Sequence, residues 1–161
     1  MVCIIDFDGT FFKNDFFKEV FFIKLIENPF YFFHHFFIKR KSLLALKIDL
    51  LESFTIPYNL DFLINPIVLN WIQIHQKEYQ KMILVSATPD FFIKRVLDKS
   101  LIFDEIYGSV DCNLKGTNKL AFIQEKWGNQ FAYMGDSNAD KPIFAAAQQA
   151  FKITPKGLVK L

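Results

Sequence analysis

Cysteine is scarce in this 161-residue chain: Cys3 and Cys112 lie far apart and form no Cys-x-x-Cys or other metal-ligand spacing. This excludes a disulfide framework, and we expect both thiols to be buried in the core of a protein from a reducing compartment. Glycine and proline are also few, at 6 each, and 52% of the residues are hydrophobic, which excludes a disordered or collagen-like chain. The length suits one folded domain with a modest insertion.

A strong excess of one charge sign is absent as well. Nineteen lysines and arginines against seventeen aspartates and glutamates leave a net charge of +2, which is too balanced for a nucleic-acid-binding surface. Residues 1–6 contain neither the basic nor the long apolar region of a secretory signal, so we expect a cytoplasmic protein. Charged residues interrupt every window of about 20 residues in the N-terminal third, which argues against a membrane-spanning helix there.

Apolar runs alternate with helical patterns along most of the chain. Strands are predicted at 2–5, 82–85, about 105–110, 131–134 and 151–153. Helices are predicted at about 60–80, with Asn65-Pro66 favoured as the start, and at about 89–99, 117–127 and 139–149. This alternation predicts an α/β fold, with a Rossmann-like, mostly parallel sheet flanked by helices. Residues 12–57 depart from it and read as two helices, so we divide the chain into a core (1–11 and 58–161) and an all-helical cap (12–57).

Polar residues follow the predicted strands, at the edge where open α/β sheets bind ligands. Four carboxylates, a hydroxyl and an ammonium group are expected to converge there: Asp6, Asp8, Asp136, Asp140, Ser86 and Lys119. Carboxylates this close need a cation, and oxygen ligands beside a phosphate favour Mg²⁺ over Zn²⁺.

The remaining groups of this set suit a phosphate. Lys119 would add positive charge, Ser86 would donate a hydrogen bond, and backbone N–H groups of the next loop, at Ala87, would complete an anion site. Lys115 lies close to Lys119 in the sequence and is the alternative site lysine; Phe122 and Ile123 follow Lys119 at helical spacing, which favours Lys119. The pattern indicates phosphoryl transfer.

Four segments resemble the signature motifs of the haloacid-dehalogenase-like (HAD) superfamily: Asp-Phe-Asp-Gly-Thr (6–10), Val-Ser-Ala-Thr (85–88), Lys119 and Gly-Asp-Ser-Asn-Ala-Asp (135–140). The resemblance covers nearly the whole chain. It implies that Asp6 attacks phosphorus to form an aspartyl-phosphate, and that Asp8 protonates the leaving oxygen and then activates water. It also implies that Asp6, the Asp8 backbone carbonyl and Asp136 hold Mg²⁺.

In the same resemblance, Asp140 and Thr10 support the site. Superfamily dehalogenases typically lack an acid two residues after the nucleophile and the ATPase pumps carry Thr there, so Asp8 narrows the implied activity to a phosphomonoesterase.

A second resemblance concerns the substrate. Three segments look like the HAD-type domain joined to UbiA-like prenyltransferases: Ile-Pro-Tyr-Asn (56–59), Asn-Leu-Lys-Gly-Thr-Asn-Lys (113–119) and Gly-Asp-Ser-Asn-Ala-Asp (135–140). This implies a sugar phosphate or a polyprenyl-linked phosphosugar as substrate, and a membrane-bound prenyltransferase as a partner.

The predicted cap is rich in phenylalanine, with eleven between positions 11 and 37. Packing between two helices accounts for many of them, but the aromatic segment 30–38 beside Lys39-Arg40-Lys41 also suits peripheral contact with anionic lipid. An accessory module that docks a membrane enzyme, with a vestigial phosphatase site, is the alternative to an enzyme. The Asp6 and Asp8 pair argues against this alternative, because docking needs no general acid.

Overall fold

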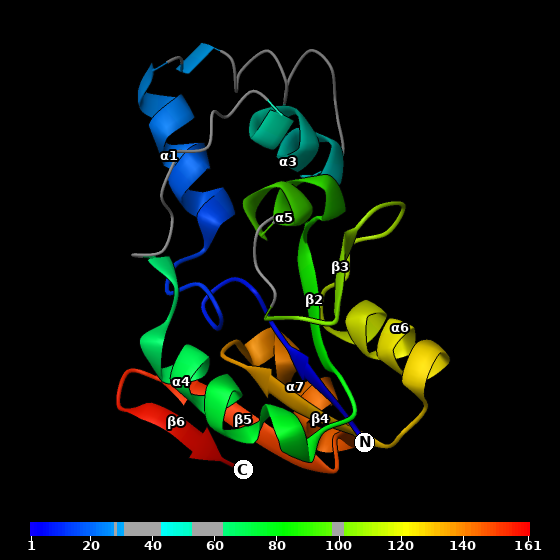
Figure 1. The fold of residues 1–161 in the computed structure, drawn as a ribbon. Helices are drawn as coiled ribbons and strands as arrows, with labels where there is room; N and C mark the ends of the chain where they lie inside the picture. The colour runs from blue at the N-terminus through cyan, green and yellow to red at the C-terminus, as the bar shows by residue number, and fades with distance from the viewer. Residues whose placement is uncertain (28, 31–42, 53–62, 98–101) are drawn as a thin grey trace.

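The computed structural model describes residues 1–27, 29–30, 43–52, 63–97 and 102–161 (Figure 1). Its centre is a six-stranded sheet with the strand order β3-β2-β1-β4-β5-β6. The strands are β1 (Val2–Ile5), β2 (Met82–Pro89), β3 (Glu105–Ser109), β4 (Phe131–Gly135), β5 (Gln149–Thr154) and β6 (Gly157–Lys160). All neighbours pair in parallel except β5 and β6, which are antiparallel. The predicted α/β fold with a mostly parallel sheet is confirmed.

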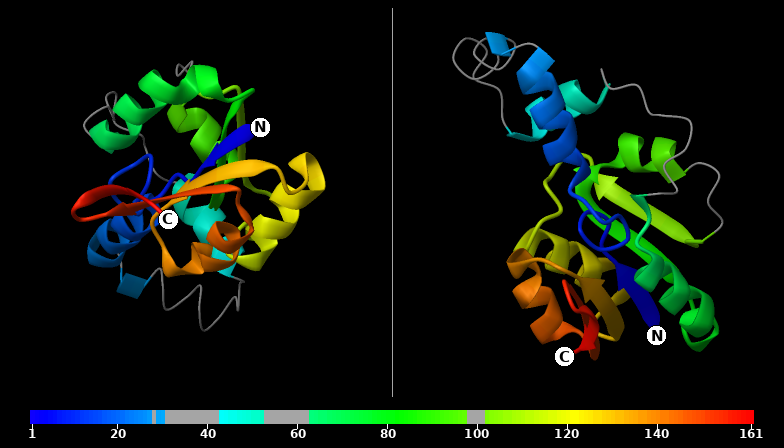
Figure 2. Two further views of the ribbon diagram at one scale, coloured as in Figure 1. Left: turned by 90° about the horizontal axis from the view of Figure 1, so that it is seen from below. Right: turned by 90° about the vertical axis from the view of Figure 1, so that its left-hand side faces the viewer.

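Side chains of the central strands alternate between two hydrophobic cores. Cys3 and Ile5 face a core that includes side chains of α4 (Pro66–His75) and α5 (Asp90–Leu97). Val2 and Ile4 face the other core, which includes Ile123 of α6 (Thr117–Trp127) and Ile143 of α7 (Lys141–Ala146). Figure 1 and the two views of Figure 2 show these helices on both faces of the sheet. Burial on both faces explains why β1 and the start of β2 are continuous apolar runs.

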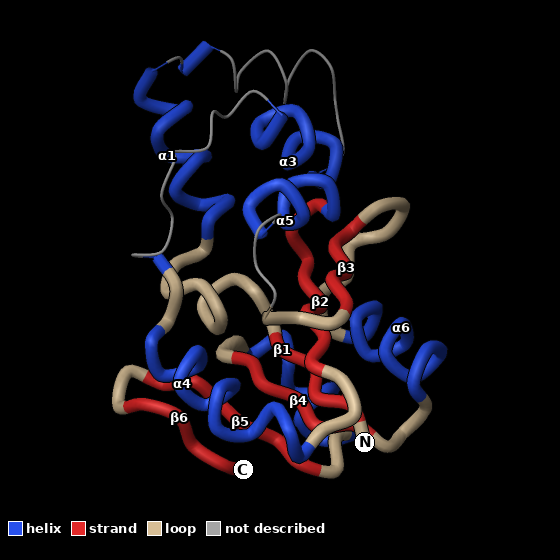
Figure 3. Tube along the Cα trace, in the orientation of Figure 1, coloured by secondary structure: helices blue, strands red, loops and turns tan. Residues whose placement is uncertain are grey.

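The helices α1 (Phe16–Glu27) and α3 (Leu43–Glu52) contact each other at the carboxyl end of the sheet (Figure 3). Several contacts join them to the rest of the fold. Among these, the Phe16 and Phe92 ring centroids lie 5.1 Å apart, and Arg95 Nη2 donates a hydrogen bond to the Leu51 carbonyl at 3.1 Å. Leu51 is fully buried in the core that contains Cys3 and Ile5. The division into a core and a cap stays a prediction.

Several predicted boundaries are wrong. The first helix begins at Phe16 and not at residue 12, because Phe12 is held in isolated β-bridges to Asp8 and Ile64. The last predicted helix is two elements, the short 3₁₀ helix η4 (Asn138–Asp140) and α7, and the chain has already entered β5 at Gln149. β6 was not predicted at all. The helix α4 begins at the favoured Asn65-Pro66, where the Asn65 side chain caps it, and a 3₁₀ turn, η3 (Gln76–Glu78), follows it.

The two thiols differ in exposure, against expectation. Cys3 is buried in β1, but Cys112 is exposed in the loop after β3. The aromatic segment 30–38 is described only at Phe30, which is 80% exposed; the rest of it and the basic residues 39–41 lie outside the described residues, as do residues 56–59. Within the described ranges, no helix has the length and apolar character needed to cross a membrane.

Candidate active site

The predicted site residues meet where the strand order reverses. β1 and β4 are neighbours, but the chain leaves β1 toward β2 and leaves β4 toward β5, so their carboxyl ends open a crevice between diverging connections. Asp6 follows β1 and Asp136 follows β4. A cavity of about 600 Å³ lies there, and Asp6, Asp8, Lys119, Asp136 and Asp140 are among the residues that line it.

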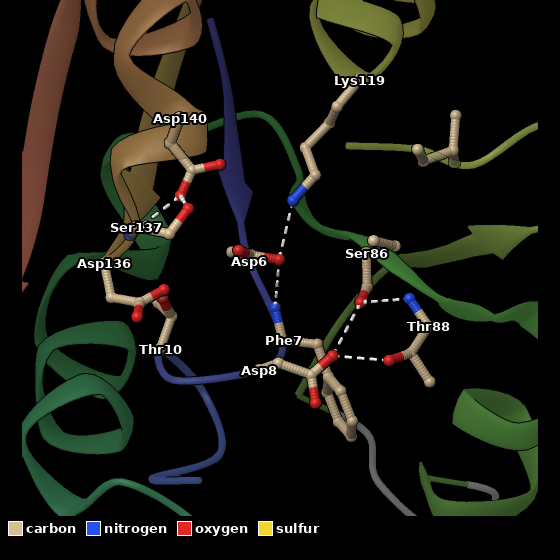
Figure 4. A network of polar contacts seen from close by, with 12 residues as sticks. Asp6, Phe7, Asp8, Thr10, Ser86, Thr88, Lys119, Asp136, Ser137 and Asp140 are labelled. Atoms are coloured by element: carbon tan, nitrogen blue, oxygen red, sulfur yellow. Dashed lines mark hydrogen bonds and ion pairs between the residues drawn. The ribbon is translucent and has the colours of Figure 1, made fainter. Parts of the chain in front are cut away.

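Asp6 is held by two donors (Figure 4). Its Oδ1 accepts hydrogen bonds from the Phe7 backbone N–H at 2.8 Å and from Lys119 Nζ at 2.7 Å. Both charged side chains are largely removed from solvent, with exposed fractions of 10% for Asp6 and 3% for Lys119. An ion pair this buried needs good geometry and further hydrogen bonds to offset its desolvation, and the Phe7 amide supplies one.

Burial raises the pKa of Asp6 to about 7, with the charges of Asp140 and Asp8 adding to the rise and Lys119 opposing it. Burial and the charge of Asp140 likewise raise the pKa of Asp136. Carboxyl groups with raised pKa values that share a cavity are a candidate site for a bound cation.

Three of these carboxylates could hold that cation. Asp6, Asp136 and Asp140 each offer an oxygen, and the three oxygens lie within 4.8 Å of one another. The three side chains are therefore close enough to one another to hold one cation between them. The donors are all carboxylate oxygens, which fits Mg²⁺ better than Zn²⁺.

The Asp140 carboxylate is fixed by its own turn. Its Oδ2 accepts hydrogen bonds from the backbone N–H of Ser137 at 3.1 Å and from Ser137 Oγ at 3.0 Å, which closes a capping box around η4. Gly135 makes room for it, because a Cβ at this position would lie 2.8 Å from Asp140 Oδ2. Asp140 therefore approaches the other carboxylates in a set orientation.

Gly9 makes room for the Asp136 carboxylate in the same way. It has a φ of +75°, and a Cβ there would lie 2.4 Å from Asp136 Oδ2. Thr10 Oγ1 donates to the other oxygen, Asp136 Oδ1, at 3.3 Å. The Gly-Thr pair of the first motif thus positions an acidic residue that lies 126 residues further along the chain.

The Asp8 carboxylate points toward the Ser86 and Thr88 side chains of β2 (Figure 4). Its Oδ2 accepts hydrogen bonds from Thr88 Oγ1 at 2.5 Å and from Ser86 Oγ at 3.4 Å. Its Oδ1 accepts the first backbone N–H of α1, from Phe16, at 3.0 Å. The carboxylate therefore contacts two separate segments, the end of β2 and the start of α1.

The structure brings all the predicted site residues to this cavity or its immediate surroundings. Ser86 and Ala87 line it, and they lie inside β2, which continues through a register shift to Pro89 instead of ending at Val85. Of the two candidate lysines, Lys119 is buried against Asp6, whereas Lys115 is exposed at the same cavity.

Sequence patterns gave no sign of Tyr133. This residue lies inside β4, fully buried, and Lys119 Nζ donates a hydrogen bond to its hydroxyl oxygen at 3.4 Å. Burial raises the pKa of Tyr133 well above its usual value, so the hydroxyl stays neutral. A tyrosine in the middle of an apolar strand looks like any other core residue, since its partner on α6 is distant in the sequence.

No model of a known protein family matches the chain. It is 29% identical over 153 residues to the uncharacterized protein y4nM of Sinorhizobium fredii, a match that covers 91% of this chain and 28% of that protein. The chain therefore spans little more than a quarter of that relative.

Solved structures are more informative about the fold. A phosphoserine phosphohydrolase-like protein from Francisella tularensis aligns with a TM-score of 0.62 at 15% identity, over 92% of this chain and 84% of that one. A phosphoserine phosphatase, described as a phospho-aspartyl intermediate analogue, aligns with a TM-score of 0.56 at 16% identity, over 92% and 84%. A HAD family hydrolase from Salmonella enterica serovar Typhi gives 0.56 at 13% identity, over 91% of this chain and 60% of that one.

The chain has the fold of the HAD-family hydrolases. The HAD resemblance drawn from the four motifs is thus confirmed at the level of the fold. Within this HAD fold, the first and fourth motifs occupy the adjacent ends of β1 and β4, and the second lies in β2. The resemblance to the domain joined to UbiA-like prenyltransferases stays a prediction.

Proposed function

We propose that this protein is a Mg²⁺-dependent phosphomonoesterase that works through an aspartyl-phosphate on Asp6. The observation that carries the proposal is the position of the Asp6 carboxylate, fixed by Lys119 at 2.7 Å and within reach of the oxygens of Asp136 and Asp140. Nucleophile, cation ligands and a compensating ammonium group thereby occupy one buried corner of a cavity that opens to solvent.

The cation would be held by Asp6, Asp136 and the Asp8 backbone carbonyl, with the Asp140 carboxylate close by in support, and when bound it would neutralise charge between the nucleophile and the phosphate. The Asp6 oxygen forms a bond to phosphorus, and the bond from phosphorus to the ester oxygen breaks. Lys119 lies beside the nucleophile and stabilises the negative charge that builds up on the phosphoryl oxygens. Ser86, which lines the cavity, donates to one of those oxygens.

Asp8 moves the protons in both half-reactions. In the first it gives a proton to the leaving ester oxygen, so that the alcohol departs neutral. In the second it removes a proton from water, which attacks phosphorus and releases inorganic phosphate and the free Asp6 carboxylate. Its contacts with Thr88 and with the start of α1 fix the orientation of the Asp8 carboxylate, which supports this role.

Two solved structures with this fold are described as phosphoserine phosphatases or a related phosphohydrolase, which supports the reaction class proposed for this chain. The substrate is proposed to be a small phosphomonoester such as a sugar phosphate. A polyprenyl-linked phosphosugar and a prenyltransferase partner rest partly on residues 56–59, outside the described ranges, and stay predictions. No contact of the described residues favours the docking-module alternative.

Hydrolysis of 4-nitrophenyl phosphate tests the proposal. Activity should require Mg²⁺ and disappear on chelation with EDTA, because without a cation the Asp6 carboxylate and the phosphate repel each other. Asp6→Asn should abolish it. Full activity in EDTA, in protein shown to retain no metal, would contradict the proposal.

A further inference from the structure

The cavity is much larger than the phosphate that its floor would hold. At about 600 Å³ it falls in the range of pockets that enclose a whole small molecule. Its floor carries the acidic residues and Lys119, and its outer walls come from α1 with the preceding loop and from the loop before α6. The part of the substrate beyond the phosphate must lie between those outer walls.

Basic residues predominate on these walls. Among the described residues, Lys13 and Lys18 line the cavity from the α1 side and Lys115 lines it from the α6 side, against one carboxylate, Asp15. Asp15 already pairs with Lys18 at 3.2 Å. Lys115 is exposed, and no ion pair joins it to any residue within the described ranges. A positively charged mouth above an acidic floor is suited to a ligand with a second anion far from the first.

The backbone around Lys115 is held firmly. Leu114, its neighbour, is buried, and the Leu114 N–H donates to Ser109 Oγ at 3.0 Å. The Lys115 N–H donates to the Asn113 carbonyl at 2.8 Å. Gly116 has a φ of +58°, and a Cβ added there would lie 3.4 Å from the Ala139 carbonyl oxygen of the acidic turn. The ammonium group is thus carried by a short, anchored loop, which lowers the entropy cost of binding an anion there.

We propose that Lys115 is a specificity-determining residue, and that the substrate is a phosphomonoester with a second anionic group, a phosphate or a carboxylate, which Lys115 binds at the mouth of the cavity. This rests on the proposed function for the hydrolysis of the first phosphate. Lys119, four residues further along and inside α6, is buried with Asp6 and is committed to the reacting phosphate. Lys115 therefore serves a different anion from Lys119.

Matched pairs of substrates test this. Fructose 1,6-bisphosphate and fructose 6-phosphate differ by a second phosphate, and 3-phosphoglycerate and glycerol 3-phosphate differ by a carboxylate in place of a hydroxymethyl group. For at least one pair, kcat/KM should be higher for the compound with the second anionic group, on the order of tenfold, as expected for a hydrogen bond between charged groups. In Lys115→Gln this ratio should fall to near one.

Lys77→Gln is the matched control. Lys77 is an exposed lysine of η3, just before the N-terminal end of β2 and so at the opposite edge of the sheet, and it does not line the cavity. Its replacement removes the same charge from the protein and should keep the wild-type ratio. A similar loss of the ratio in Lys77→Gln would mean that net charge, and not Lys115, causes the preference, and it would overturn the proposal.

Binding separates this proposal from the proposed function. Calorimetric affinities of the same four compounds for Asp6→Asn in Mg²⁺ should show the same preference, and Asp6→Asn/Lys115→Gln should lose it. Absence of hydrolysis by the wild type with this binding preference intact would contradict only the phosphatase. Hydrolysis without a preference in either pair, or a preference that survives Lys115→Gln, would overturn the role of Lys115.

Discussion

Lys119 Nζ lies 2.7 Å from Asp6 Oδ1, and the two side chains form a buried ion pair between residues 113 positions apart in the sequence. The pair links the end of β1 to the first turn of α6. It has two consequences: it fixes one oxygen of the proposed nucleophile, and it makes the stability of the fold depend on a residue of the candidate site.

Lys119→Met should therefore damage both stability and activity. Removing one partner leaves the Asp6 carboxylate buried without its cation, which costs about 3–5 kcal/mol in the free energy of unfolding, measured by urea denaturation. The kcat/KM for 4-nitrophenyl phosphate should fall by at least about 100-fold because the developing charge loses a partner. Lys77→Met, at an exposed site, should change stability by no more than about 0.5 kcal/mol; equal losses in the two variants would contradict the pairing.

Gly9→Ala should impair Mg²⁺ binding. The new Cβ would lie 2.4 Å from Asp136 Oδ2, so the carboxylate must move away from the other two acids. Gly128→Ala is a close control, because Gly128 has a similar φ of +69° and an added Cβ would meet nothing within 4 Å. Both variants should lose about 1–3 kcal/mol, because a residue with a side chain is strained in either positive-φ conformation. Only Gly9→Ala should also weaken Mg²⁺ affinity in calorimetric titrations.

The stabilising effect of Mg²⁺ should depend on pH. In the metal-free protein the pKa of Asp6 is raised to about 7 from an ordinary value of 3.8. Between these values the folded protein binds more protons than the unfolded chain, so this group contributes stability at low pH that is lost as the pH rises through about 7. Mg²⁺ replaces the proton, and it competes better at high pH.

The rise in melting temperature on adding Mg²⁺ should thus be larger at about pH 8 than at about pH 5.5. Asp6→Asn should show a small rise that is similar at both pH values. A wild-type rise that does not change with pH would show that Asp6 does not bind the metal.

Thr88→Val should slow turnover by about tenfold and lower stability by about 1–3 kcal/mol. The substitution keeps the shape of the buried side chain but removes the hydroxyl that donates to Asp8 Oδ2 at 2.5 Å. The Asp8 carboxylate then loses one of the hydrogen bonds that fix its orientation. Thr88→Ser restores a hydroxyl and should recover most of the activity; if serine is as slow as valine, the hydrogen bond is not the reason.

The sequence predicts the order of strands and helices well in the core, because parallel strands buried on both faces leave uninterrupted apolar runs such as Ile83-Leu84-Val85. It fails where local pattern and tertiary contact disagree. Ser86 and Thr88 look like a polar loop, but they are buried inside β2 because Asp8, about 80 residues earlier, accepts their hydrogen bonds.

Other boundaries could have been found from local signals. Asp15 accepts the Lys18 N–H at 3.1 Å and marks the start of α1 as an N-cap residue does, whereas the phenylalanines before it mimic helical spacing. The hairpin of β5 and β6 has a turn signal, Thr154-Pro155-Lys156-Gly157, in which Thr154 Oγ1 donates to the Gly157 carbonyl. Without this turn signal, β6 is hard to recognise in the sequence, because a short, half-exposed edge strand has few apolar residues.

The candidate site, too, is predicted by the sequence in part and decided by tertiary contacts in part. The four motifs predict which residues gather, since strand ends in a parallel sheet share one edge. They do not predict that Asp140 offers an oxygen within 4.8 Å of both other acids, nor that Tyr133 contacts Lys119. These depend on the capping box of η4 and on the depth of β4, which only the folded chain determines.

Mass spectrometry of acid-quenched Asp8→Asn, mixed with Mg²⁺ and 4-nitrophenyl phosphate, tests the central claim most directly. Without its proton carrier the second half-reaction should be the slower one, so phosphate should accumulate on the enzyme. We predict a mass increase of one phosphoryl group, confined to the peptide that contains Asp6, absent in EDTA and absent from Asp6→Asn/Asp8→Asn. Hydrolysis by the wild type together with an unmodified Asp6 peptide, or a phosphoryl group on another residue, would contradict it.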